Sequence, residues 1–150
     1  MSISIQRAGE QQAEAAFSLI EEYYEAVGVV VRDDRAALEH YLASPESPIW
    51  IASVDDVLAG CVMLRPLPQI AGAVEAKRLY VRNEFRGRRV AHALMEAAEE
   101  YVRANSMQWI YLDTKDDLQA AIHFYLGTGY ERCPRYNDNP QATLFLRKRI

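Results

Sequence analysis

Apolar side chains near the start of the chain recur with two different spacings. Between Ser2 and Arg7 they alternate with polar ones, with Ile3 and Ile5 on one face, which predicts a short strand. From Glu10 to Val27 they recur every three or four residues, which predicts an amphipathic helix. Gly28 follows directly, and glycine commonly ends a helix. The pattern therefore predicts a strand and then a helix.

A second helix and three strands follow in the pattern. The carboxylate of Asp33 or Asp34 is suited to cap a helix whose apolar side chains include Leu38. Two of the strands enclose a polar turn at Asp55-Asp56, and Gly60 inside the second of them indicates a bulge. The three strands are predicted over Ile49–Val54, Val57–Leu64 and Ala73–Val81.

The second half of the chain alternates helices with strands. A long apolar stripe predicts one helix, and Asp116 followed by Gln119 resembles a capping box at the start of another. The predicted helices are Gly87–Ala104 and Asp116–Leu126, and the predicted strands are Trp109–Leu112, Tyr130–Cys133 and Thr143–Leu146. The resulting order, β-α-α-β-β-β-α-β-α-β-β, predicts an α/β (α+β) fold in which helices cover both faces of a mixed sheet.

Length and charge narrow the class of protein. A chain of 150 residues, half of them hydrophobic and a quarter charged, fits one globular domain with its own core. The formal net charge is -4, from 17 basic and 21 acidic side chains. A protein that binds nucleic acid over its surface is usually basic, so this class is disfavoured.

Cysteine usage and the N-terminus argue against a metal centre and an export signal. Cys61 and Cys133 lie far apart and form no CxxC pair, so we expect buried thiols and neither a disulfide nor a metal site. Met1–Gly9 has no apolar signal region, and no apolar run reaches the roughly 20 residues of a membrane span. We therefore expect a cytoplasmic protein without membrane contact.

Basic residues gather in one stretch that runs from a strand into the first turn of a helix. The first N–H groups of a helix lack intrahelical partners, and the helix dipole adds about half a positive charge there. Cations are unfavourable at that end unless an anion binds, and Gly87 allows the backbone to approach a phosphate closely. A solvated basic surface is the alternative. The stretch contains Lys77, Arg78, Arg82, Arg86, Arg88 and Arg89.

This stretch is neither a Walker loop nor a dinucleotide fingerprint, since it has no GxxxxGK and no GxGxxG. From Lys77 to Met95 it resembles the core motif of the GNAT superfamily of acyl-CoA N-acyltransferases, which reads R/Q-x-x-G-x-G/A at the start of a helix. Arg86 matches the first position and Ala91 the last. Arg89 occupies the fourth position, where glycine is usual, so its direction is left open.

Two further segments carry the resemblance toward the C-terminus. The family signature A-x-x-x-Y-x-x-x-G-F/Y is matched by Ala121, Tyr125, Gly129 and Tyr130. Leu112–Thr114 and Tyr136–Pro140 resemble a bacterial subgroup with an LDT strand and a Y-x-x-N-P loop. Leu118 is a departure, because the family often has an asparagine there that contacts the cofactor.

The resemblance implies one N-acetyltransferase domain over residues 1–150, with a mostly antiparallel sheet and acetyl-CoA as the acyl donor. The pantetheine arm would pair with the strand that contains Leu79, and the phosphates would lie at the turn around Gly87. The implied cofactor-binding residues are Leu79, Tyr80, Val81, Arg86, Gly87, Arg88, Arg89, Val90, Ala91 and His92.

Two residues are candidates for proton transfer. Glu75 lies on the cofactor strand, where related enzymes carry an acidic residue, and it would act as the general base toward an amine. Tyr125 would lie next to the CoA sulfur and would protonate the departing thiolate. The alternatives are an exposed glutamate paired with a basic neighbour and a buried tyrosine with a satisfied hydroxyl.

The acceptor side is implied only by the subgroup resemblance. It would be lined by Asp113, Thr114, Tyr136 and Asn139, which otherwise form the end of a strand and a polar turn. The expected acceptor is a primary amine of a small molecule or a peptide, and family members often form homodimers. A non-catalytic acyl-CoA-binding or sensing domain of the same fold is the main alternative, and a nucleic-acid module that uses the arginines is the second.

Overall fold

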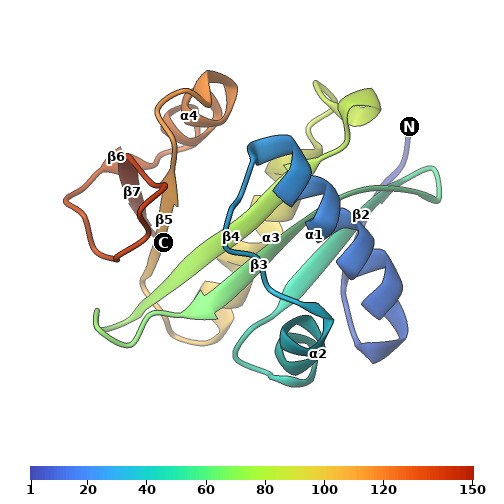
Figure 1. The fold of residues 1–150 in the computed structure, drawn as a ribbon, viewed down its shortest axis with the longest axis horizontal. Helices are drawn as coiled ribbons and strands as arrows, with labels where there is room; N and C mark the ends of the chain where they lie inside the picture. The colour runs from blue at the N-terminus through green and yellow to red at the C-terminus, as the bar shows by residue number, and fades with distance from the viewer.

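A single seven-stranded sheet runs through the computed structural model, which describes residues 1–150 (Figure 1). The strands are β1 (Ile3–Arg7), β2 (Ile49–Val54), β3 (Val57–Pro66), β4 (Ala73–Val81), β5 (Trp109–Thr114), β6 (Glu131–Arg132) and β7 (Leu144–Arg149). The helices are α1 (Ala13–Val27), α2 (Arg35–Ala43), α3 (Val90–Ala104) and α4 (Gln119–Gly127), with short 3-10 turns η1 (Glu10–Gln12) and η2 (Asn83–Phe85). The strand order is β1-β2-β3-β4-β5-β7-β6.

Helices cover both faces of the sheet, as the element order predicts. In Figure 1, α1 and α2 lie in front of the strands and α3 lies behind them. On the α3 side, Leu94, Ala98 and Val102 are fully buried against the strands. On the α1 side, Leu19 and Tyr24 belong to a second apolar cluster. The predicted α/β fold with a mixed, mostly antiparallel sheet is confirmed.

The parallel pairing between β4 and β5 is short, and it ends in the middle of the sheet. Only Ala73, Val74 and Glu75 of β4 pair with β5, opposite the stretch that begins at Trp109. Both strands continue beyond these pairs without bonding to each other, so the two strands separate from Glu75 onward (Figure 1). The separation leaves backbone groups of β4 available to an extended ligand.

Bulges shape the strands beside this separation. Val62 of β3 faces two residues of β4, Arg78 and Leu79, and Arg78 has a left-handed φ of 61°. The bulge predicted at Gly60 lies one residue earlier, at Ala59, which is the extra residue of β3 in its pairing with β2. A Cβ on Gly60 would lie 2.3 Å from the carbonyl oxygen of Tyr80, so only glycine allows this close approach of the strands.

Two helices begin later than predicted. The helix predicted from Gly87 begins at Val90, because Gly87 (φ 77°) and Arg89 (φ 64°) are left-handed and cannot belong to an α-helix. The helix predicted from Asp116 begins at Gln119, whose side chain donates to the Asp116 carbonyl oxygen, and no capping box forms there. The basic turn therefore precedes α3.

The bounds of three other elements require smaller corrections. The strand predicted over Tyr130–Cys133 is reduced to Glu131–Arg132, and the last strand extends to Arg149. Asp34, and not Asp33, caps α2 by accepting a hydrogen bond from the N–H of Ala37. No helix is long and apolar enough to cross a membrane.

Candidate active site

The turn before α3 presents a run of free backbone donors. The N–H groups of residues 87–92 donate to no acceptor within the protein. Three of them belong to the first turn of α3, where helical N–H groups lack partners. Gly87 and Arg89 before it have left-handed backbones, and such turns of successive N–H groups commonly form anion-binding nests.

The two left-handed residues differ in what they cost the fold. A Cβ on Gly87 would meet no atom within 4 Å, so the backbone conformation and not space favours glycine there. Arg89 adopts φ 64° without being glycine, which costs about 1–2 kcal/mol. Arg89 is among the residues that line the cavity beside the turn.

A cavity of about 850 Å³ runs from this turn along β4 to α4. All the residues that the resemblance implies for the cofactor line it except Arg88. The Arg88 side chain is exposed and its guanidinium carbon lies 5.9 Å from the ring centroid of Phe85. The predicted residues that do line the cavity are Leu79, Tyr80, Val81, Arg86, Gly87, Arg89, Val90, Ala91 and His92.

The sequence motifs point to α4 through Tyr125 but do not identify the wall that α1 contributes to this cavity. Tyr23 and Val27 reach it from α1, and Phe124 lies beside Tyr125 on α4. An apolar residue on an amphipathic helix looks like a core residue, so no local signal marks these side chains. Leu118 also lines the cavity, and it supplies no polar atom where the family often has asparagine.

The six basic residues of the stretch lie in different environments, so they do not form one anion site. Arg82 forms an ion pair of 2.7 Å with Glu22 of α1. Lys77 and Arg78 line a different cavity, where they contact carboxylates. Only Arg86 and Arg89 remain beside the free N–H groups. The anion site therefore relies on backbone donors and two guanidinium groups.

Tyr125 lies at the inner end of the first cavity. Its side chain is buried, its ring packs against Tyr130 with a centroid distance of 5.5 Å, and its hydroxyl makes no hydrogen bond to the protein. Burial, with smaller contributions from the Tyr23 and Asp113 side chains, raises the pKa of Tyr125 well above its usual range. The hydroxyl therefore keeps its proton at neutral pH and is available to donate it.

A second cavity of about 670 Å³ adjoins the first, since Val27 and Thr114 line both. Its floor is formed by side chains of β3, β4 and β5 on the α1 face of the sheet. Its walls are the connection between α1 and α2, residues 28–34, and the loop 137–142 before β7. A group held in the second cavity can reach one held in the first only at this shared wall.

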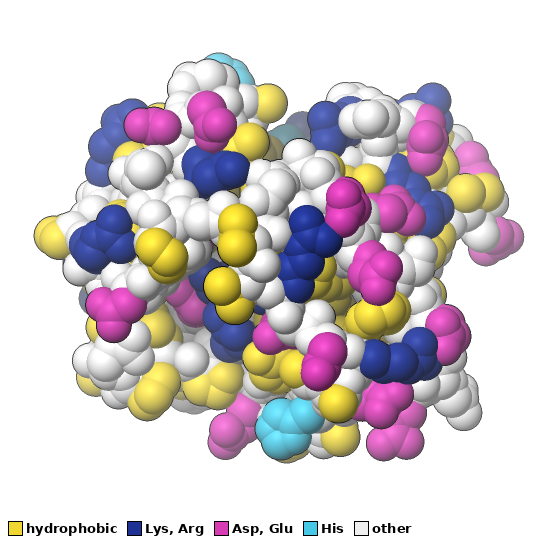
Figure 2. Space-filling model, viewed as in Figure 1, with side chains coloured by type: hydrophobic (Ala, Val, Ile, Leu, Met, Phe, Trp, Pro, Cys, Tyr) yellow, Lys and Arg dark blue, Asp and Glu magenta, His cyan; other side chains and the backbone are white.

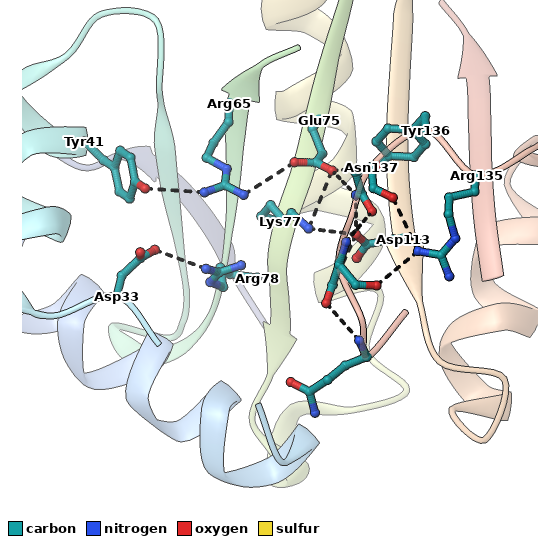
Figure 3. A network of polar contacts seen from close by, with 12 residues as sticks. Asp33, Tyr41, Arg65, Glu75, Lys77, Arg78, Asp113, Arg135, Tyr136 and Asn137 are labelled. Atoms are coloured by element: carbon teal, nitrogen blue, oxygen red, sulfur yellow. Dashed lines mark hydrogen bonds and ion pairs between the residues drawn. The ribbon is translucent and has the colours of Figure 1, made fainter. Parts of the chain in front are cut away.

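Glu75 and Asp113 lie on the floor of the second cavity within one polar network (Figure 3). Glu75 is only 6% exposed, and its Oε2 accepts hydrogen bonds from the Tyr136 hydroxyl (2.7 Å) and the Asn137 amide (3.0 Å). Lys77 Nζ lies 3.0 Å from Asp113 Oδ2 and 3.5 Å from Glu75 Oε2. The cation is therefore shared by both carboxylates.

Asp113 is held in its charged form. Burial works against the charge, but Lys77 and hydrogen bonds from Asn137 and Asn139 outweigh it, so the pKa of Asp113 lies below its usual value. Burial and the Glu75 carboxylate raise the pKa of Tyr136 far above its usual range, so this phenol acts as a donor. Tyr136 reaches the network through its hydroxyl and does not itself line the cavity.

The predicted acceptor residues therefore come together. Asp113 and Thr114 at the end of β5 and Asn139 of the loop line the second cavity, with Tyr136 beside them. Arg65 also lines it, and no sequence motif points to this residue because it lies on β3, far from all of them. No group of three or more His, Cys, Asp or Glu side chains is arranged to hold a metal ion.

The site combines two strands that separate within the sheet, a turn of free N–H groups before a helix, and two adjoining cavities. These features are those of proteins that bind an extended phosphorylated ligand beside a second substrate. Residues 13–130 match the Acetyltransferase (GNAT) family. The chain belongs to this family. An uncharacterised N-acetyltransferase of Schizosaccharomyces pombe is 30% identical over 128 residues, which cover 81% of this chain and 78% of that protein.

Other relatives share less of their length or only the fold. A probable N-acetyltransferase of Xenopus laevis, camello, is 24% identical over 102 residues, 67% of this chain and 47% of that protein. A GNAT-family acetyltransferase of Staphylococcus aureus superposes with a TM-score of 0.83 at 19% identity, covering 99% of both chains. The PaiA N-acetyltransferase of Thermoplasma acidophilum, solved in complex with coenzyme A, gives 0.82 at 17% identity over the whole of both chains.

Proposed function

We propose that this N-acetyltransferase transfers the acetyl group of acetyl-CoA directly to a primary amine while both substrates are bound. The observation that carries the proposal is the run of unpartnered N–H groups at residues 87–92. They fit a pyrophosphate because they are fixed donors at the positive end of a helix, with Arg86 and Arg89 beside them. The solved relative from Thermoplasma acidophilum binds coenzyme A, which supports this assignment.

The separation of β4 and β5 suits the rest of the donor. An extended pantetheine arm would bond to the unpaired backbone of β4 between Lys77 and Val81, as in strand addition. This position brings the thioester toward the inner end of the cavity, where the Tyr125 hydroxyl is free. A backbone N–H of β4 would stabilise the charge that develops on the thioester oxygen.

Proton transfers would be divided between the two cavities. Glu75 in the second cavity would take a proton from the attacking amine, directly or through water. Tyr125 in the first would protonate the departing thiolate, which its retained proton allows. Most of the rate gain would come from holding the amine and thioester together at the wall that Val27 and Thr114 share.

Three wider expectations belong to the same proposal. Residues 1–150 form one catalytic domain, since a single sheet contains both the first and the last strand. The protein acts in the cytoplasm, which fractionation of cells would check. Sedimentation would show whether it is a monomer or the homodimer that family members often form.

The direct test is release of free thiol from acetyl-CoA across a broad panel of primary amines, combined with thermal unfolding in the presence of CoA. We expect CoA to raise the unfolding temperature and at least one class of amine to release thiol. CoA binding without thiol release from any amine would favour the non-catalytic sensing domain. Binding to DNA or RNA that falls steeply with salt, without CoA binding, would favour the nucleic-acid module.

A further inference from the structure

The second cavity has a charge opposite to that of the protein around it. Four basic side chains and three acidic ones line it, whereas the whole chain carries a net charge of -4. Acidic side chains gather over α1 on the neighbouring surface (Figure 2), where they line a separate groove. A site for a plain cationic amine would be expected to show the reverse distribution. The basic residues of the cavity are Arg65, Lys77, Arg78 and Lys115.

The two lysines are held by neighbouring groups of the protein. Lys77 lies between Glu75 and Asp113, and Lys115 Nζ donates to the Val27 carbonyl oxygen at 2.8 Å, at the C-terminal end of α1. The carboxylates are also satisfied, since Glu75 and Asp113 each accept at least two hydrogen bonds from polar neighbours. Because a guanidinium has five N–H donors and an ammonium three, most of the unused charged donors of the cavity belong to the two arginines.

Arg65 has the weakest contacts of the network. Its guanidinium lies 3.4 Å from the Tyr41 hydroxyl and 3.5 Å from Glu75 Oε1, while good N–H···O bonds cluster at about 2.9–3.0 Å (Figure 3). A guanidinium has five N–H donors, so most of those on Arg65 are not used. Its side chain is 29% exposed and faces the cavity. It is placed to receive a planar anion in two parallel bonds.

Arg78 strengthens the same side of the cavity. One of its terminal nitrogens pairs with Asp33 at 3.1 Å and its Nε donates to the Tyr24 hydroxyl at 3.3 Å, which leaves the other terminal nitrogen without a partner. Its contacts with Tyr24 and Asp33 place it on the α1 face of the sheet (Figure 3), where it lines the same cavity as Arg65. Two guanidinium groups thus line this cavity.

Three consecutive apolar residues also line the cavity, and a glutamine holds their segment in place. Val29, Val30 and Val31 line the cavity from the connection after α1, and Val30 and Val31 are 76% and 80% exposed overall. Gln141 of the loop before β7 accepts a hydrogen bond from the Val30 N–H (2.9 Å) and donates to the Gly28 carbonyl oxygen (3.1 Å). This clamp joins the two walls and gives the cavity one apolar rim.

We infer that the acceptor carries a carboxylate and an apolar side chain in addition to its amine, as a free apolar α-amino acid does. The inference rests on the proposed acetyl transfer. Arg65 and Arg78 would hold the carboxylate, the valines would cover the side chain, and the amine would face Glu75 and the shared wall. A new N–C bond forms and the thioester C–S bond breaks, the amine proton passes to Glu75, and Tyr125 protonates sulfur. The products are an N-acetyl amino acid and CoA.

The test compares leucine with leucinamide, which differs only at the carboxylate, by thiol release with acetyl-CoA. We expect wild-type kcat/KM to be higher for leucine. Arg65→Gln should lower kcat/KM for leucine by roughly 10- to 100-fold, mainly through KM, and that for leucinamide by less than about threefold. Because Arg65 also contacts Glu75, the ratio between the two acceptors is the readout, and it cancels any common effect on the base.

Two further variants complete the design. Arg65→Lys keeps the charge but loses the planar fork, so it should recover part of the leucine activity. Arg32→Gln removes a cation from the same connection outside the cavity, where Arg32 pairs with Glu25, and should leave the ratio unchanged. Equal losses of kcat/KM for leucine and leucinamide in Arg65→Gln, which leave their ratio unchanged, would overturn the inference.

The substrate class and the proposed function fail in different ways. Turnover of amines without a carboxylate, combined with none for apolar amino acids, would overturn the substrate class and leave acetyl transfer intact. Thiol release from no amine at all, with CoA binding retained, would remove acetyl transfer and the inference together.

Discussion

The two cavities of the site differ in the polar groups that they offer to a ligand. The first offers backbone groups, the free N–H groups of residues 87–92 and the unpaired edge of β4. The second offers side chains, with Glu75, Asp113 and Lys77 supported by the loop before β7. The same donor can therefore be bound by many sequences, whereas the acceptor depends on a few named side chains.

The difference explains why Arg89 is tolerated within the anion site. A backbone site requires a conformation, and the left-handed turn is retained although arginine replaces the usual glycine. The N–H groups of the turn still have no acceptor within the protein, and Arg89 is one of the residues that line the cavity. A comparable substitution in the second cavity, where each polar atom has a specific partner, would leave a buried charge without its counterpart.

Gly87→Asp should have the largest effect on the backbone site. The new carboxylate would stand beside bound phosphates and the left-handed backbone would be strained, so we expect the CoA-induced rise in unfolding temperature to disappear. Gly28→Asp is the matched control, because Gly28 also has a left-handed φ (76°) and open space around its Cβ but lies outside the phosphate turn. A full CoA shift in Gly87→Asp would show that the phosphates bind elsewhere.

Tyr125→Phe tests the proton donor where the two cavities meet. Loss of a general acid should lower kcat by about 100-fold or more while KM for acetyl-CoA changes little. Tyr130→Phe is the control, because the neighbouring Tyr130 hydroxyl is buried without a hydrogen-bond partner and its removal should leave kcat unchanged. Equal kcat values for the two variants would exclude Tyr125 from the chemistry.

Glu75→Gln tests the second cavity, whose polar groups are side chains, without changing the first. We expect kcat at neutral pH to fall by roughly 10- to 100-fold with unchanged affinity for acetyl-CoA, because glutamine keeps the size but accepts no proton. Glu99→Gln provides the comparison, since Glu99 is also buried but pairs with Lys148 away from both cavities. An unchanged kcat at saturating substrates would remove Glu75 from the mechanism.

The pair Arg89→Ala and Arg89→Gly should have the smallest effects. Both remove the guanidinium, so both should raise KM for acetyl-CoA by several-fold, the loss of a partly exposed charged hydrogen bond. Arg89→Gly also relieves the left-handed strain and should be more stable than Arg89→Ala by about 1 kcal/mol. Chemical unfolding would measure this difference, and a less stable glycine variant would contradict the strain assigned to φ at this position.

Sequence patterns predict the backbone site well because its elements are contiguous. A strand, a turn with Gly87 and a helix follow one another between Ala73 and Ala104, so spacing alone brings the donors together. The helix start was misplaced because a left-handed arginine at position 89 has no sequence signature. Arg82 belongs to the basic stretch in sequence but pairs with Glu22 of α1, which no local pattern connects to this strand.

The side-chain site is harder to predict because its residues come from distant elements. Asp113 and Asn139 were found through a resemblance, and Glu75 through its place on the cofactor strand. Arg65 could be found only from the pairing of β3 with β4, which sets it opposite Glu75. The loop motif suggests no role for Asn137, although its amide donates to both Glu75 and Asp113.

The central claim is that the backbone of residues 87–92 holds the phosphates of the donor. Hydrogen exchange of individual amide protons, followed by NMR with and without CoA, tests it directly. We expect CoA to slow exchange at these residues by at least about tenfold, because each free N–H gains a phosphate acceptor, while amides of β1 stay unchanged. Unchanged exchange at residues 87–92 in the CoA-bound protein would contradict the account.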